Sequence, residues 1–320
     1  MRAIVLTEKG GPEVLRVVDG LEDPIPGPEE VVVDVAATAL NRADVLQRMG
    51  FYPQPGPAPA HEIPGLEVAG RVVAVGSRAT LWSVGDEVMA LVSGGGYASR
   101  IAVHERQVMA VPPAVGLPDA AAIPEVFLTA WDALVVQGGL TSGRWALVHA
   151  GASGVGTAAI QICKAIGAFV ATTASAGKLG HLTELGADRV IDRASDDWGL
   201  RDEIDVVLDV VGGDYVDRNF AALRTKGTIV QVGTMAGSPP AFNVGLLLMK
   251  RAAWIGTTLR ARPLEEKIAL TQRFAREVLP LFDTGALRPI VDSRFPLEDA
   301  PAAHERMESN VTVGKVLLTL

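Results

Sequence analysis

A short apolar run, followed at once by a glycine-rich turn and an amphipathic segment, constrains this chain more than any other feature. The run Trp145–Val148 precedes glycines at 151, 154 and 156, and apolar residues then recur every three to four positions up to Ile166. Such a run is typical of a buried parallel strand, and the later spacing is typical of one helix face. Strand, glycine turn and helix open a dinucleotide-binding βαβ unit, in which a pyrophosphate lies against the amino end of the helix.

The glycine turn departs from the G-x-G-x-x-G pattern at one position. Ser153 stands where the second glycine is expected, and an ordinary glycine-rich turn is the alternative interpretation. If the turn binds a cofactor, the residues that contact it are Gly151, Ser153, Gly154, Val155 and Gly156.

Composition excludes several classes of protein. The 320 residues are 48% hydrophobic with a net charge of −8, which indicates a globular chain and disfavours a nucleic-acid-binding surface. No apolar run approaches the roughly 18 residues of a membrane span, and the start of the chain leads into a strand, so neither a membrane segment nor a secretory leader is expected. The single cysteine, Cys163, fits a reducing cytoplasm and is expected to be an inert core residue.

The distribution of strands and helices predicts two domains of different character. Strands are expected at 2–6, 14–18, 30–36, 68–75, 86–92 and 97–103, then at 145–149, 168–173, 189–192, 205–210, 227–232 and 252–258, and again at 290–295 and 313–318. Helices are expected at 41–49, 119–123, 125–137, 154–166, 176–185, 215–223, 243–250, 264–282 and 297–308, and the proline-rich segment 51–65 is expected to be a loop.

These elements predict an α/β fold with a doubly wound parallel sheet inserted into a barrel-like β domain. Strand and helix alternate from residue 144 onward, which is typical of a parallel dinucleotide-binding sheet. The end of the chain returns to the strand-rich character of its beginning. The expected limits are 1–122 plus 264–320 for the β domain and 123–263 for the nucleotide-binding domain.

The end of the second strand of the predicted nucleotide-binding domain indicates which cofactor fits. A site for NADH usually has an acidic residue there, but Thr173 is followed by Ser175 and Lys178 and by no carboxylate. Ser175, Lys178 and Arg193, which follows the third strand, can donate hydrogen bonds to a 2′-phosphate. The alternative for Lys178 is a solvated side chain at a helix start. The pattern predicts NADPH, with Thr173 also at the site.

Several blocks of sequence resemble the zinc-independent quinone oxidoreductases of the medium-chain dehydrogenase/reductase superfamily, the zeta-crystallin-like group. The blocks are Leu40–Tyr52, Ile63–Val72, Ala150–Gln161, Asp205–Gly213 and Gly314–Leu318. Asn-Arg-Ala-Asp at 41–44, the Tyr52 loop and Glu308–Asn310 are most similar to the p53-inducible branch of that group. The resemblance implies a GroES-like substrate domain, made from both chain ends, with a Rossmann domain between them.

The zinc ligands of related alcohol dehydrogenases are missing. Their first cysteine and their histidine would fall near Leu40–Asn41 and at Leu66, and a four-cysteine structural site is impossible with one cysteine. His61 with Glu62 beside it does not make a metal site. We therefore expect no metal and no zinc-dependent alcohol oxidation.

Without a metal, hydride transfer requires an acceptor that is already electron-poor, such as a quinone or a conjugated enone. Tyr52 and Asn41 are the candidates to face that acceptor, and Tyr52 can donate a hydrogen bond or a proton. For Asn41, capping the helix at 41–49 is the alternative. Asp44 and Arg48, one helical turn apart, are expected to form an ion pair.

Further cofactor contacts are expected where the parallel strands end and where the family places them. By the first rule they are Val211, Gly233 and Thr234; by the resemblance they are Thr129, Thr257, Leu259 and Asn310. For Thr129, a hydroxyl bonded to the preceding helical turn is the alternative.

The sequence thus predicts a cytoplasmic, NADPH-dependent, zinc-independent quinone reductase acting on a small molecule. The alternatives are a reductase of enones or alkenals on the same fold and a non-catalytic NADPH-binding protein. The apolar runs Leu246–Met249 and Ala252–Ile255 lie at the last sheet strand and predict a homodimer that covers this edge.

Overall fold

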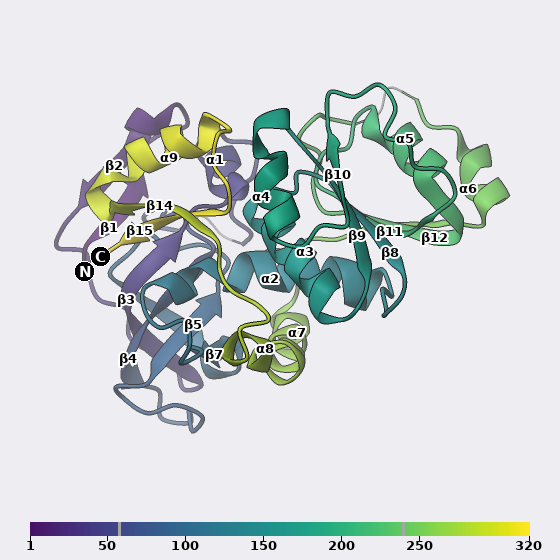
Figure 1. Ribbon diagram of the computed structural model, residues 1–320. Helices are drawn as coiled ribbons and strands as arrows, with labels where there is room; N and C mark the ends of the chain where they lie inside the picture. Colours follow the sequence, from purple (N-terminus) through teal and green to yellow (C-terminus); the bar gives the residue numbers. More distant parts are fainter. Residues whose placement is uncertain (57–58, 239–240) are drawn as a thin grey trace. The chain divides into compact units, whose positions relative to one another are not determined.

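The computed structural model describes residues 1–56, 59–238 and 241–320, which form two compact units. One unit comprises Met1–Glu125 with Leu259–Leu320, and the other comprises Val126–Thr258. Each unit has its own sheet and its own buried apolar core, and most helices and strands of both are labelled in Figure 1. Pro57 of the expected proline loop lies outside the described residues.

The unit Val126–Thr258 is built around a six-stranded parallel sheet in the order β10-β9-β8-β11-β12-β13. Its strands are β8 (Trp145–Val148), β9 (Phe169–Ala174), β10 (Arg189–Asp192), β11 (Ile204–Asp209), β12 (Leu223–Gln231) and β13 (Ala253–Gly256). Its helices are α3 (Gly154–Ala165), α4 (Leu179–Glu184), α5 (Tyr215–Ala222) and α6 (Val244–Lys250). Before them in the chain come α2 (Pro124–Trp131), whose first two residues belong to the other unit, and the π-helical turn η4 (Asp132–Gln137). In order along the chain, this sheet is the 3-2-1-4-5-6 arrangement of the doubly wound dinucleotide-binding fold, so the predicted fold class is confirmed.

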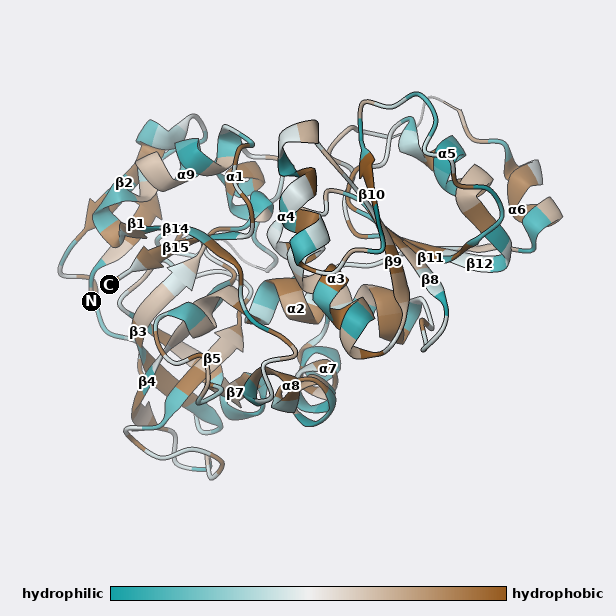
Figure 2. Ribbon diagram, viewed as in Figure 1, coloured by the Kyte–Doolittle hydropathy of each residue, from teal (hydrophilic) through white to brown (hydrophobic). Residues whose placement is uncertain are grey.

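One face of this sheet packs against α5 and the loop before β11. Leu147 and Val207 from the strands share a buried cluster with Phe220 of α5 and Leu200 of that loop. The central strand β11 is buried along its whole length and β9 is brown in Figure 2, because a doubly wound sheet is covered on both sides, whereas the edge strand β10 begins with Arg189 and ends with Asp192.

The other unit contains a seven-stranded sheet in the order β14-β15-β3-β4-β5-β7, with β6 paired to β3, and a separate β1-β2 hairpin. The strands are β1 (Ala3–Leu6), β2 (Leu15–Val18), β3 (Glu30–Ala39), β4 (Glu67–Val75), β5 (Glu87–Leu91), β6 (Arg100–His104), β7 (Val108–Ala110), β14 (Val291–Pro296) and β15 (Lys315–Thr319). The helices are α1 (Arg42–Arg48), α7 (Leu264–Glu277), α8 (Pro280–Asp283) and α9 (Ala300–Glu308). Strand β15 pairs antiparallel with β3, so the two chain ends build one sheet.

Several predicted elements differ from the structure. The helix expected at 264–282 is two helices, because Pro280 lacks the N–H that would donate the next hydrogen bond of α7. The helix expected at 125–137 changes from α to π geometry after Trp131. The strand expected at 97–103 begins only at Arg100, with Ala98 contributing a single bridge to Ala3. Strand β7 was not expected.

Candidate functional site

The glycine turn between β8 and α3 has the geometry of an anion-binding helix start. Ser153 is the N-cap of α3, and its Oγ accepts a hydrogen bond from the N–H of Gly156 at 3.0 Å. A Cβ at Gly151 would lie 2.0 Å from Thr172 Oγ1, and one at Gly156 would lie 2.4 Å from the carbonyl of Ala150. Both glycines are therefore required for the turn to close onto β9. The first N–H groups of α3 have no intrahelical acceptor, so those of Gly154 and Val155 can bind a phosphate.

The departure from the glycine pattern at Ser153 has a structural reason. A hydroxyl at the N-cap stabilises a helix start by about 1 kcal/mol relative to alanine and by a few tenths of a kcal/mol relative to glycine. The serine therefore supports α3 while leaving the next amides available for a ligand.

The residues predicted to bind a 2′-phosphate lie at one edge of the sheet. Ser175 directly follows β9, and the N–H of Arg193 donates to the carbonyl of Ala174 at 2.8 Å, since β10 pairs with β9 in parallel up to Asp192. Lys178 ends the short helix η5 (Ala176–Lys178) that follows Ser175. The carboxylate of Asp192 accepts from the N–H of Ala194, within its own turn. This edge presents a hydroxyl and two cations, which fits a dianionic phosphate.

A buried polar network, which sequence reasoning missed, connects the ends of β8, β9 and β11. The carboxylate of Asp209 accepts from the backbone N–H groups of Val211 and Gly212 and from Asn219 Nδ2. Because Asn219 donates its NH₂ to Asp209, its Oδ1 accepts from His149 Nε2, 2.6 Å away. His149 Nδ1 then accepts from the hydroxyl of Thr173 at 2.9 Å.

This network has two consequences for the site. Burial lowers the pKa of His149, so the imidazole is neutral and has a fixed tautomer. The hydroxyl of Thr173 donates its hydrogen bond to His149 and so helps to hold the network together. The predicted contact between Thr173 and the cofactor stays a prediction. One signal in the sequence pointed to the network: His149 and Asp209 stand where central parallel strands end, and ligands of α/β sheets bind at that edge.

The other residues predicted to contact the cofactor follow β11, β12 and β13. The segments after β11 and β12 are held together by the N–H of Ala236, which donates to the carbonyl of Val211 at 2.8 Å. Gly233 and Thr234 begin the second of these segments. Thr257 follows β13 and bonds Asp132 Oδ2 at 3.1 Å, and Thr129 is buried on α2. Leu259 is buried in the other unit.

The residues predicted for the acceptor lie in the unit formed by both chain ends. Tyr52 follows α1 and is half-buried, with the guanidinium carbon of Arg260 5.0 Å from its ring centroid. His61 is exposed. Asn310 adopts φ +56° before β15, and its Oδ1 accepts from Arg42 of α1 at 2.8 Å.

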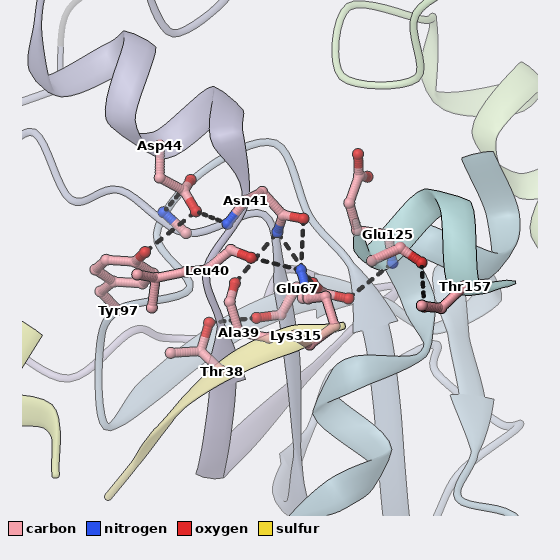
Figure 3. A network of polar contacts seen from close by, with 12 residues as sticks. Thr38, Ala39, Leu40, Asn41, Asp44, Glu67, Tyr97, Glu125, Thr157 and Lys315 are labelled. Carbon is pink, nitrogen blue, oxygen red and sulfur yellow. Dashed lines mark hydrogen bonds and ion pairs between the residues drawn. The ribbon is translucent and has the colours of Figure 1, made fainter. Parts of the chain in front are cut away.

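Asn41 is enclosed by a buried charge pair, shown in Figure 3. Its Nδ2 donates to Glu67 Oε1 at 2.9 Å and to the carbonyl of Ala39, and its Oδ1 accepts from Lys315 Nζ at 2.6 Å. Lys315 and Glu67 also contact each other at 2.8 Å, and both are buried. Both amide hydrogens of Asn41 are thus donated within this unit. Asn41 is also the N-cap of α1, which was the alternative role for this residue. A contact between Asn41 and the acceptor stays a prediction.

The predicted ion pair between Asp44 and Arg48 is wrong. Asp44 accepts from the N–H groups of Asn41 and Gly65 and from the hydroxyl of Tyr97, and burial raises the pKa of its carboxyl to about 6. Arg48 instead pairs with Glu308 at 2.8 Å. Asp44 is the third residue of α1, where a carboxylate turns back to the free N–H groups of the helix start.

Comparisons with known proteins agree with this geometry. Residues 27–113 match the family model described as alcohol dehydrogenase GroES-like domain, and residues 185–318 match the model described as zinc-binding dehydrogenase. The quinone oxidoreductase of Lama guanicoe is 32% identical over 331 residues, which cover 100% of this chain and 98% of that protein.

The chain belongs to the medium-chain dehydrogenase/reductase superfamily. The family predicted from the sequence is therefore confirmed.

Two further members of the superfamily bear on what such chains do. The "synaptic vesicle membrane protein VAT-1 homolog" of Rattus norvegicus is 32% identical over 343 residues, covering 99% of this chain and 84% of that protein. The crystal structure of Escherichia coli quinone oxidoreductase complexed with NADPH superposes with a TM-score of 0.88 at 29% identity, and the match covers 100% of both chains.

This medium-chain dehydrogenase/reductase lacks a metal cluster in the part of the chain that the structure describes: no three His, Cys, Asp or Glu side chains there are grouped to hold an ion. Leu66 is buried and apolar, and the oxygen of the Asn41 amide is taken by Lys315. Over the same described residues, no helix is both long and apolar enough to cross a membrane.

Proposed function

We propose that the chain is an NADPH-dependent quinone reductase that works without a metal. It is an oxidoreductase of its superfamily, and NADPH is its cofactor. The observation that carries the proposal is the edge beside β9, where Ser175, Lys178 and Arg193 stand in place of the carboxylate of an NADH site. The E. coli relative that binds NADPH and is titled a quinone oxidoreductase supports both the cofactor and the acceptor class.

When bound, NADPH supplies a hydride. The chain's own residues bind, orient and protonate. The amino end of α3 holds the pyrophosphate, and the network of His149, Asn219 and Asp209 holds the turns around it. Tyr52 donates a hydrogen bond or a proton to the acceptor oxygen as negative charge develops on it.

A metal-free site restricts the acceptor. Carbonyl groups of simple aldehydes and ketones need stronger polarisation, from a Lewis acid or a proton donor, whereas quinones and conjugated enones are electron-poor enough to accept a hydride more readily. Both kinds of acceptor become oxyanions on reduction, so the same residues serve either. We favour quinones because of the relatives in Lama guanicoe and E. coli that are named for them.

Cofactor titration and an acceptor screen test the proposal. We expect the protein to bind NADPH more tightly than NADH by fluorescence titration, and to oxidise NADPH when a benzoquinone or naphthoquinone is added. Enone reduction without quinone reduction would make the protein an enone reductase. NADPH binding with no oxidation over a broad acceptor panel would favour the non-catalytic binding protein.

We also propose domain limits and an assembly. The expected domains, 1–122 plus 264–320 and 123–263, correspond to the two units except for a few residues at their limits, among them Leu259 and Arg260, and the protein is a homodimer in the cytoplasm. Strand β13 is at the end of its sheet, and α6 beside it exposes Leu248 and Met249, at 74% and 75% of their surface. A second copy would cover both.

A further inference from the structure

Arg260 is a buried arginine that donates hydrogen bonds to three neutral acceptors. It is 5% exposed. Its Nε donates to the carbonyl of Ser93 at 2.8 Å, Nη1 donates to the carbonyl of Tyr52 at 3.2 Å, and Nη2 donates to Gln47 Oε1 at 2.7 Å. Its guanidinium therefore ties three separate segments of one unit together.

The same guanidinium stacks on the side chain predicted to face the acceptor. Its carbon lies 5.0 Å from the centroid of the Tyr52 ring, a cation–π arrangement. Backbone and ring of Tyr52 are thus both held by Arg260, which follows directly after Leu259, the predicted nicotinamide contact. The position of Tyr52 depends on Arg260 through two different interactions.

The charge of Arg260 has no direct partner. Among the residues that the structure describes, Arg260 forms no direct ion pair, and the carboxylates of Asp44, Glu62 and Glu125 act on its charge through space. Glu62, one of these carboxylates, is bound by Lys9 at 2.6 Å and by Gln47 Nε2 at 3.0 Å. A buried charge without a directly contacting counter-charge is unfavourable, because neutral hydrogen bonds replace only part of its hydration.

A second cation reinforces the charge at this place. Lys267 Nζ donates to Ser93 Oγ at 2.6 Å, and Ser93 is the residue whose carbonyl accepts from Arg260. Burial first, and then the charge of Arg260, lowers the pKa of Lys267. One serine thus joins two cations, of which Arg260 stacks on Tyr52.

We propose that Arg260 positions Tyr52 and that its unpaired charge makes the acceptor site selective for molecules that become oxyanions on reduction. This inference rests on the proposed function. Transfer of a hydride, two electrons and one hydrogen nucleus, from NADPH to a quinone leaves NADP⁺ and a hydroquinone mono-anion, and one proton then completes the hydroquinone. The mono-anion adds a negative charge near a cation that has no direct ion pair, so the barrier falls where that charge develops.

The test measures recognition of an oxyanion without turnover. Calorimetry on the NADP⁺-bound protein compares 4-nitrophenolate, at a pH where it is ionised, with the neutral 4-nitroanisole. One charge acting over about 7 Å at an effective dielectric of about 20 corresponds to at least ~10-fold tighter binding of the phenolate. Arg260→Gln should reduce this preference to less than ~2-fold, and Arg260→Lys should keep most of it because the charge remains.

Controls separate this role from a structural one. Arg78→Gln removes one cation from an exposed pair with Glu29 and should keep the preference. If the role of Arg260 were merely structural, Arg260→Gln would weaken the binding of both probes and of NADPH equally. Melting curves show whether each variant folds, and if Arg260→Gln does not, the wild-type comparison still decides.

Each outcome bears on one proposal. A wild-type protein that reduces quinones but binds both probes equally refutes the inference and leaves the proposed function standing. Retention of the phenolate preference in folded Arg260→Gln also refutes it. A clear preference lost in Arg260→Gln, in a protein that reduces no quinone, supports the oxyanion site and refutes the quinone reductase.

Discussion

Replacing Ser175 by aspartate should reverse the cofactor preference. Ser175 follows β9 beside Arg193, where an NADH site carries its acidic residue. In Ser175→Asp, the carboxylate would face the 2′-phosphate of NADPH in place of a hydroxyl donor, but it could accept a hydrogen bond from the 2′-hydroxyl of NADH.

The magnitude follows from the exposure of the site. A unit charge about 5 Å from a second one, at an effective dielectric of about 20, is repelled by about 3 kcal/mol. Ser175 is only half-buried, so water and salt reduce this value, while loss of the hydroxyl donor adds to it. We expect a net loss of about 2–3 kcal/mol, which is a ~30–150-fold weaker dissociation constant for NADPH.

Fluorescence titration of the folded variant with NADPH and with NADH checks this. Ser142→Asp is the matched control, because Ser142 precedes β8 and places the same carboxylate at the amino edge of the same sheet. The control should leave both dissociation constants within about 2-fold of wild type, because salt screens its charge over the distance from the amino edge of the sheet to the cofactor site. If Ser175→Asp binds NADPH within about 3-fold of wild type, the assignment of this edge to the 2′-phosphate is refuted.

Three further predictions follow from packing, titration and assembly. In Gly151→Ala, the new Cβ would lie 2.0 Å from Thr172 Oγ1, so we expect a loss of about 2–3 kcal/mol in the free energy of unfolding and weaker NADPH binding. Gly180→Ala in α4, with open space around its Cβ, should lower neither quantity, and urea unfolding and NADPH titration of both variants decide. Burial, with a smaller contribution from Arg48, lowers the pKa of His304 to about 3, so stability is lost as the pH falls below the ordinary histidine value near 6.5. At pH 5 this loss of stability amounts to about 2 kcal/mol. Between pH 7.5 and pH 5 the free energy of unfolding of His304→Gln should therefore fall less than that of wild type. An equal fall in both proteins would contradict the prediction. Leu248→Glu puts a charge on the exposed face of α6 and should convert the proposed dimer to a monomer in sedimentation velocity, and a wild-type protein that is already monomeric at micromolar concentration would remove that proposal.

The fold could be predicted because its signals are local. The apolar run at 145–148, the glycine turn and the helix spacing that follows are all contained in about twenty residues, and the alternation of strands and helices needs only neighbouring segments. Errors occurred where local signals compete. At 264–282 the helix pattern continues through Pro280, and the structure ends the helix before it.

The candidate site could be predicted only in part. The residues around Gly151–Gly156 and after β9 follow from position alone, because the carboxyl ends of parallel strands define one edge. Asp44 and Arg48 show the limit of such reasoning. Their spacing permits an ion pair, but Asp44 is held by Asn41, Gly65 and Tyr97, and Arg48 finds Glu308 at the other end of the chain.

The sequence by itself determined the fold class, the family and the expected cofactor, since these depend on periodicity, glycine positions and the absence of an acidic residue after Thr173. Only the tertiary structure decided which polar side chains pair. Asn41 meets Lys315 across 274 positions, and Arg260 meets Gln47 across 213. Such partners carry no local signal, because a buried polar group is stabilised by whichever donor or acceptor the folded sheet brings to it. For the same reason, the sequence gives no sign that Arg260 is buried without a direct ion pair.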